Sequence, residues 1–242
     1  MPEVDFSELS AVFLNCSLKR DAAESHTMRL VRRAAGIMTD EGVAVDVVHV
    51  RDHRIPFGMA TDMSDHGEPV DDWPDLQRRL DGADIVVLGS PIWLGTKSSV
   101  ATLVIERMYA GSAETNDRGQ YRAYGKVAGC VVTGNEDGVK AVSRDVLYAL
   151  QHIGYMVPPA ADCGWIGSIG PGPSYGDEVE EHDAPTGYDS EFTNRTCTTM
   201  AWNLMHTARL LRANGGFPTP GNAVGEWRHV TNAEDQNPAR AS

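Results

Sequence analysis

The stretch "ADIVVLGSPIWLGTKSSVATLVIERM", residues 83–108, contains an apolar strand, a turn and a helix. The run "DIVVLGS" is continuously apolar, as in strands that are buried on both faces of a sheet. We expect the strand to break at Gly-Ser-Pro, to expose Trp93 and to resume as a helix that ends near Ala110. Pro91 fixes its own φ and Gly95 allows close backbone approach, so this turn indicates a ligand site.

The same alternation of strand and helix extends in both directions from this stretch. Further strands are expected in the ranges 8–17, 43–50, 126–135 and 155–165, and further helices in 24–41, 73–83, 136–154 and 192–213. Alternation of this kind predicts an α/β fold, with a parallel sheet covered by helices on both faces. Five strands suit a three-layer, flavodoxin-like sheet of order 2-1-3-4-5, in which ligands bind at the carboxyl ends of the strands. We interpret residues 1–214 as one domain and residues 215–242 as a C-terminal tail.

The composition limits the class of protein. An apolar share of 41% and a charged share of 23% over 242 residues are typical of a soluble globular protein. Apolar runs stay shorter than the ~20 residues of a membrane span, and the acidic N-terminus does not resemble a secretory signal. Four cysteines without a CxxC pair argue against a thiolate zinc site and indicate reduced thiols, so a cytoplasmic location is expected.

The charge distribution argues against one class of partner. A net charge of -13 opposes binding to nucleic acid, which requires a basic surface. The range 177–191 has seven acidic residues and no Lys or Arg, and it is interpreted as a solvated loop.

Three loops follow the first, third and fourth strands, and each has residues suited to a ligand. In the first loop, hydroxyls at a helix N-terminus favour an anion, although Ser25 or Thr27 alternatively caps the helix. In the second, Trp93 offers a flat face, although it alternatively packs on a neighbouring loop or subunit. In the third, two glycines and an amide around Asn135 suit the carbonyl edge of a heterocycle, although an ordinary helix start has the same pattern. Together the three loops match the phosphate, the ring and the carbonyl edge of FMN.

These motifs also resemble a known family. "CSLKRDAAESHTMRL" is similar to a phosphate loop written GSxRxxSxT, with Cys16 in place of a common Gly and a longer gap before Ser25. "GSPIWLGTKSSVATLVIERM" and "YGKVAGCVVTGNEDG" resemble the second and third loops of flavodoxin-like NADPH-dependent FMN reductases. The resemblance covers roughly residues 9–213. It implies that phosphate is held by Ser17, Lys19, Ser25, His26 and Thr27, the ribityl chain and ring by Pro91, Ile92, Trp93, Leu94 and Gly95, and the ring's polar edge by Thr133, Gly134, Asn135, Glu136, Asp137 and Gly138.

The resemblance implies an FMN-dependent NAD(P)H oxidoreductase. Hydride passes from NAD(P)H to FMN and then to a quinone, a flavin or a similar small acceptor, and no side chain is assigned as a catalytic acid, base or metal ligand. The alternative is a flavodoxin-type electron carrier that docks redox partners. The resemblance also implies a homodimer or homotetramer, and a pocket shared between subunits would explain the Gly/Pro-rich range 164–175.

Overall fold

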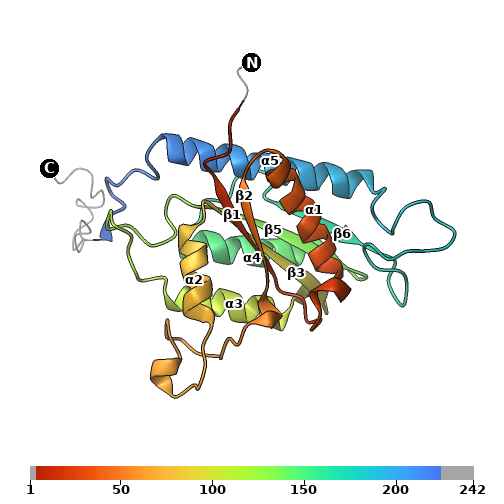
Figure 1. Cartoon of the computed structure of the whole chain (residues 1–242), viewed down its shortest axis with the longest axis horizontal. Coiled ribbons are helices and arrows are strands. Elements are labelled where there is room, and N and C mark those ends of the chain that lie inside the picture. The colour runs from red at the N-terminus through yellow and green to blue at the C-terminus, as the bar shows by residue number, and fades with distance from the viewer. Residues whose placement is uncertain (1–3, 225–242) are drawn as a thin grey trace, which may run out of the picture.

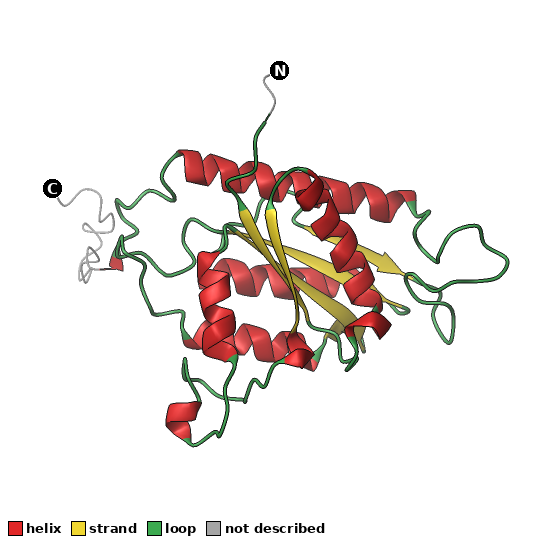
Figure 2. Cartoon of the chain, viewed as in Figure 1, coloured by secondary structure: helices red, strands yellow, loops and turns green. Residues whose placement is uncertain are grey.

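The computed structural model describes residues 4–224 and contains a sheet with five long parallel strands. The strands are β1 (Ser10–Asn15), β2 (Ala44–His49), β3 (Ile85–Trp93), β5 (Val127–Gly134) and β6 (Asp162–Ile166). Their order is β2-β1-β3-β5-β6, and every neighbouring pair is parallel. This confirms the predicted flavodoxin-like order. Figure 2 shows the strands lying between layers of helices.

The helices cover the two faces of the sheet unequally. Helices α1 (His26–Asp40) and α5 (Glu191–Ala213) bury apolar side chains in one core, together with inward residues of β1, β3 and β5. Helices α2 (Trp73–Gly82), α3 (Ser99–Ala110) and α4 (Val139–Ile153) build the core on the opposite face. Figure 1 shows α5 running along one side of the molecule and α2, α3 and α4 gathered on the other. The three-layer prediction is thereby confirmed.

The turn after β3 differs from the expectation. The strand continues through Pro91, which pairs with Thr133, and ends at Trp93. A two-residue turn then leads into the short antiparallel strand β4 (Thr96–Lys97). The prediction of a break at Gly-Ser-Pro was wrong because the pairing with β1 ends at Gly89, so Pro91 lies where one edge of β3 is free.

A buried ion pair anchors the long connection between β2 and α2. The Arg107 side chain on α3 lies 2.6 Å from Asp71, and both side chains are fully buried. Arg107 also donates a hydrogen bond to the Pro56 carbonyl at 2.8 Å, and its guanidinium lies 5.7 Å from the centre of the Trp73 ring. Buried charges of this kind are tolerated only when paired, so the geometry of this connection depends on Arg107.

The described part of the predicted tail packs against the loop that precedes β5. Gln120 donates hydrogen bonds to the carbonyls of Phe217 and Pro218, and the ring of Phe217 lies 5.6 Å from that of Tyr124. The rest of the predicted tail, residues 225–242, lies outside the described residues. Within residues 4–224, no helix has the length and apolar character that crossing a membrane requires.

Candidate functional site

A cavity of about 590 Å³ opens at the carboxyl ends of β1, β3, β5 and β6. Volumes of ~300–1,000 Å³ are usual for small-molecule and cofactor sites. Ten residues predicted from the sequence line the cavity: Ser17, Lys19, His26, Thr27, Pro91, Ile92, Trp93, Thr133, Gly134 and Asn135. Leu18, Trp165, Gly170, Pro171, Gly172, Ser174 and Tyr175 complete its walls. The topology therefore brings the three predicted loops to one cavity.

The first loop places polar and cationic groups at the start of α1. Ser17, Lys19, His26 and Thr27 reach the cavity there, and the first N–H groups of an α-helix lack partners within the helix. The helix dipole adds partial positive charge at the same end. This donor set is suited to a phosphate group.

Ser25 has a different position from its neighbours. Its side chain is fully buried, accepts a hydrogen bond from the N–H of Met28 at 3.0 Å and is the N-cap of α1. It is also within hydrogen-bond distance of Asn15. The structure thus places the Ser25 hydroxyl beneath the loop, and Ser25 is not among the residues that line the cavity.

A buried polar network below the first loop was missed from the sequence. The amide of Asn15 lies 2.9 Å from Nδ1 of His49, and Nε2 of His49 lies 3.0 Å from the carbonyl oxygen of Lys19. If the Asn15 amide donates to Nδ1, the proton of a neutral His49 ring is on Nε2 and the ring donates to Lys19. His49 at the end of β2 therefore fixes the backbone of the first loop. The one signal in the sequence for this role of His49 was its position at the end of the predicted strand 43–50.

The second loop contributes Pro91, Ile92 and Trp93 to the cavity, whereas Leu94 and Gly95 form the turn beyond it. Trp93 is half exposed, so a large part of the indole surface remains open beside the cavity. Ser98 is the N-cap of α3, and its hydroxyl donates a hydrogen bond to the Cys16 carbonyl at 2.7 Å. That bond ties the second loop to the first.

The third loop contributes Thr133, Gly134 and Asn135. Glu136, Asp137 and Gly138 do not line the cavity. Gly138 has φ +142, and a Cβ there would lie 3.0 Å from Cα of Gly95. Glycine is therefore required where the second and third loops meet, and the role of Gly138 is to let them approach.

The fourth wall comes from the end of β6 and the segment that follows it. Trp165 is 9% exposed, and its ring lies 5.7 Å from that of Tyr175. Burial raises the pKa of Tyr175 to about 12, so its phenol stays neutral at physiological pH. The sequence indicated the Gly/Pro-rich range 164–175, which includes Trp165, as part of a pocket, without an individual role for Gly172 or Ser174.

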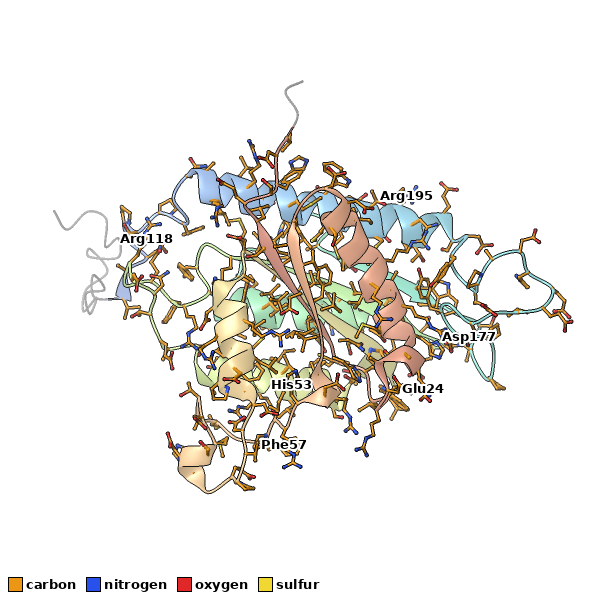
Figure 3. All side chains as sticks on the ribbon, in the orientation of Figure 1. Glu24, His53, Phe57, Arg118, Asp177 and Arg195 are labelled. Atoms are coloured by element: carbon orange, nitrogen blue, oxygen red, sulfur yellow. The ribbon has the colours of Figure 1, made fainter. Side chains whose placement is uncertain are left out.

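Asp177 connects this wall to α1. Its carboxylate lies 2.9 Å from Arg29 and 3.4 Å from Nδ1 of His26. Burial acts to raise the pKa of Asp177, but hydrogen bonds from Ser174 and Arg29 and the nearby positive charges outweigh it, so the pKa lies below its ordinary value. Figure 3 shows Asp177 on the loop between β6 and α5, on the same side of the view as Glu24, which lies two residues before the start of α1. The acidic range 177–191 is therefore held against α1 through its first residue, Asp177.

None of the four cysteines lines the cavity, and all four are buried. Burial raises the pKa of the Cys16 and Cys130 thiols well above the usual range, so both are inert at neutral pH. Within residues 4–224, no group of three His, Cys, Asp or Glu side chains is arranged to hold a metal ion. The lining instead suits FMN, because it joins phosphate-type donors at α1 to flat apolar and aromatic surfaces at β3 and β6.

Known proteins share this architecture and much of the sequence. The family model described as NADPH-dependent FMN reductase matches residues 9–165. The 8-demethyl-8-aminoriboflavin-5'-phosphate synthase of Streptomyces davaonensis is 36% identical over 210 residues, which cover 84% of this chain and 79% of that protein. The crystal structure of RosB with bound 8-demethyl-8-formylriboflavin-5'-phosphate superimposes with a TM-score of 0.74 at 34% identity, covering 85% of this chain and 81% of that one.

A second curated relative is much longer than this chain. It is named divalent metal cation transporter MntH of Mycobacterium bovis (strain ATCC BAA-935 / AF2122/97) and is 51% identical over 219 residues. The match covers 90% of this chain but 31% of the relative, so this chain spans about a third of that protein's length. The family assignment therefore rests on the family model and on the relatives of similar length. The chain therefore belongs to the NADPH-dependent FMN reductase family.

Proposed function

We propose that the protein holds FMN in the cavity at the ends of β1, β3 and β5 and transfers hydride equivalents from NAD(P)H to a small acceptor. The acceptor class is a quinone, a free flavin or a similar planar oxidant. The observation that carries the proposal is the convergence of phosphate-type donors, a half-exposed indole and a close-packed third loop on one cavity.

The first loop is assigned to the phosphate of FMN. Ser17, Lys19 and Thr27 donate hydrogen bonds, and Lys19 and the start of α1 supply positive charge. Hydrogen bonds between ionised and neutral groups contribute ~1.5–3 kcal/mol each. His49 and Ser25 act below the loop, since they hold its backbone and the first turn of α1 in place.

The remaining walls are assigned to the ribityl chain and the ring. Pro91, Ile92 and Trp93 offer an apolar surface, and Trp165 offers an aromatic surface with the buried ring of Tyr175 packed against it. Thr133 and Gly134 lie at the end of β5, where backbone and hydroxyl groups are placed for the polar edge of a heterocycle. The flavin itself supplies the hydride and electron chemistry when bound. The protein binds the flavin, orients it and limits the access of water to it.

The absorption spectrum of the purified protein, with mass spectrometry of its heat-released cofactor, tests the first half of this proposal. FMN is the expected cofactor, whereas FAD or a colourless protein that ignores added FMN would contradict it. Steady-state oxidation of NADH and NADPH with quinones and free flavins tests the second half. A stable semiquinone without NAD(P)H turnover would favour the electron-carrier alternative.

A second candidate function is suggested by the synthase of Streptomyces davaonensis. According to its name, the product of that enzyme is a modified riboflavin-5'-phosphate, that is, a modified FMN. In this alternative, FMN in the cavity is a substrate that is altered at the ring. Aerobic incubation with FMN and an amine donor, followed by mass spectrometry of the flavin, distinguishes the two. An unchanged flavin mass with NAD(P)H consumption supports the reductase, and a changed mass supports flavin modification.

The proposal extends to organisation and assembly. Residues 1–214 act as one FMN-binding domain with residues 215–242 as a tail, and the protein works in the cytoplasm as a homodimer or homotetramer. The exposed side chains of Trp93, Leu94 and Ile169 near the cavity suit either an acceptor or a partner subunit. Light scattering at micromolar concentration tests the assembly, and a monomer would contradict it.

A further inference from the structure

The segment 170–175 covers the cavity without regular secondary structure. It supplies five lining residues, Gly170, Pro171, Gly172, Ser174 and Tyr175. Within it, one backbone hydrogen bond joins the N–H of Gly172 to the carbonyl of Gly170. Glycine leaves such a chain many conformations, so contacts from elsewhere must decide where the segment lies.

Asn135 provides the first of these contacts from the end of β5. Its Nδ2 lies 3.3 Å from the Gly172 carbonyl and 3.2 Å from the Pro173 carbonyl. Its Oδ1 accepts a hydrogen bond from the Ser174 hydroxyl at 3.1 Å. The amide nitrogen and the amide oxygen of Asn135 are therefore both bonded to the segment 170–175. From the sequence, Asn135 was predicted to contact the cofactor instead.

Asp177 provides the second contact from the far end of the segment. Its carboxylate accepts a hydrogen bond from the Ser174 N–H at 2.8 Å and pairs with Arg29 of α1 at 2.9 Å. The carbonyl of Tyr175 lies 3.4 Å from the same Arg29 guanidinium and 3.2 Å from Nδ1 of His26. The helix that begins at the proposed phosphate site thus also holds the segment.

We propose that Asn135 and Asp177 are positioning residues that latch the segment 170–175 over the cavity and so set how long FMN stays bound. The inference rests on the proposed FMN site. Asn135 acts on the flavin through the segment, and Asp177 acts through Ser174 and α1. Because Ser174 is bonded by both residues, loss of either latch removes one of the two bonds that hold the middle of the cover.

Hydrogen exchange in the protein without FMN tests the latch directly. The amides of Gly172, Ser174, Gly176 and Asp177 are hydrogen-bonded and report on this region. Asn135→Asp keeps the size of the side chain but turns a carboxylate oxygen toward two carbonyls. We expect at least tenfold faster exchange in this region for Asn135→Asp and several-fold faster exchange for Asp177→Asn, which keeps an acceptor for the Ser174 N–H.

A matched control comes from α5. Asn203 also donates to a carbonyl, that of Pro159 at 2.7 Å, but it lies outside the cavity lining. Asn203→Asp should leave exchange in the region 170–177 at the wild-type rate. Equal acceleration in this control would mean that added negative charge, not the latch, is responsible, and would overturn the proposal.

The dissociation rate of FMN, measured by stopped-flow fluorescence, and iodide quenching of the bound flavin complete the test. We expect about tenfold faster dissociation and greater quenching in Asn135→Asp. Unchanged exchange together with weaker FMN binding would make Asn135 a direct cofactor contact and refute the latch. A wild-type protein that does not bind FMN would refute the proposed function, while the exchange measurement would still decide whether the latch exists.

Discussion

The Oγ1 atoms of Thr27 and Thr133 lie 2.7 Å apart, although 106 residues separate them in the chain. Thr27 is in the first turn of α1, Thr133 is near the end of β5, and both side chains line the cavity. The hydrogen bond therefore joins the proposed phosphate loop to the proposed ring-edge loop.

Thr27→Val should lower the free energy of unfolding by ~1–3 kcal/mol, because it leaves the buried Thr133 hydroxyl without this partner. FMN affinity should also fall, since the hydroxyl assigned to phosphate is lost. Thr27→Ser retains the hydroxyl and is the matched control. Urea unfolding and fluorescence titration with FMN measure both effects. A Thr27→Val protein with wild-type stability and affinity would contradict the assignment.

Ser25→Ala should act mainly on stability. The fully buried hydroxyl caps α1, and loss of an N-cap costs ~1 kcal/mol, within a range of ~0.5–2. Ser190 caps α5 in the same way, so Ser190→Ala is a control for capping alone. Urea unfolding should give similar losses for the two variants. If Ser25→Ala abolished FMN binding at unchanged stability, a direct phosphate contact would be the better explanation.

Trp93→Ala should weaken FMN binding by a few-fold to tenfold and leave the fold intact. The side chain is 51% exposed, and a ring contact contributes ~0.5–1.5 kcal/mol beyond area burial. Flavin fluorescence should rise, because the indole no longer lies beside the ring. Titration and emission spectra measure these changes. An altered oligomeric state with unchanged flavin affinity would instead assign Trp93 to a subunit interface.

Arg107→Met should lower the free energy of unfolding by ~3–5 kcal/mol, since it leaves the carboxylate of Asp71 buried without its partner. The exposed pair of Arg79 and Asp46 offers the comparison, and Arg79→Met should cost only ~0–1 kcal/mol. Urea unfolding of both variants checks the difference. Equal losses would show that burial does not decide the strength of these pairs.

The long elements could be predicted because their residues repeat with a clear period or form continuous apolar runs. The strand β4 could not, since two residues carry no period, and Pro91 was misread because its effect depends on where β1 ends. The cavity followed from topology, which brings the ends of β1, β3 and β5 together. The wall at 170–175 was harder, because its position is decided by Asn135 and Asp177 and not by a local pattern.

Leu94→Asn should raise the midpoint of thermal unfolding. Leu94 has φ 49 and Gly95 has φ 76, so both residues of the turn between β3 and β4 have positive φ, as a type I′ hairpin turn requires. Asparagine before glycine is the preferred sequence for this turn, and a left-handed conformation costs other L-residues ~1–2 kcal/mol. The leucine is 91% exposed, so its removal sacrifices little packing.

A gain of about 1 kcal/mol corresponds to ~2–4 °C for a chain of this size. Differential scanning calorimetry measures the shift, and Leu94→Ala serves as the control, because it removes the same side chain without relieving the backbone. Midpoints below that of the wild type in both variants would show that the leucine side chain itself stabilises the turn. If the asparagine variant is more stable but turns over quinones or flavins more slowly, the strained leucine is retained for contact with the acceptor at the mouth of the cavity.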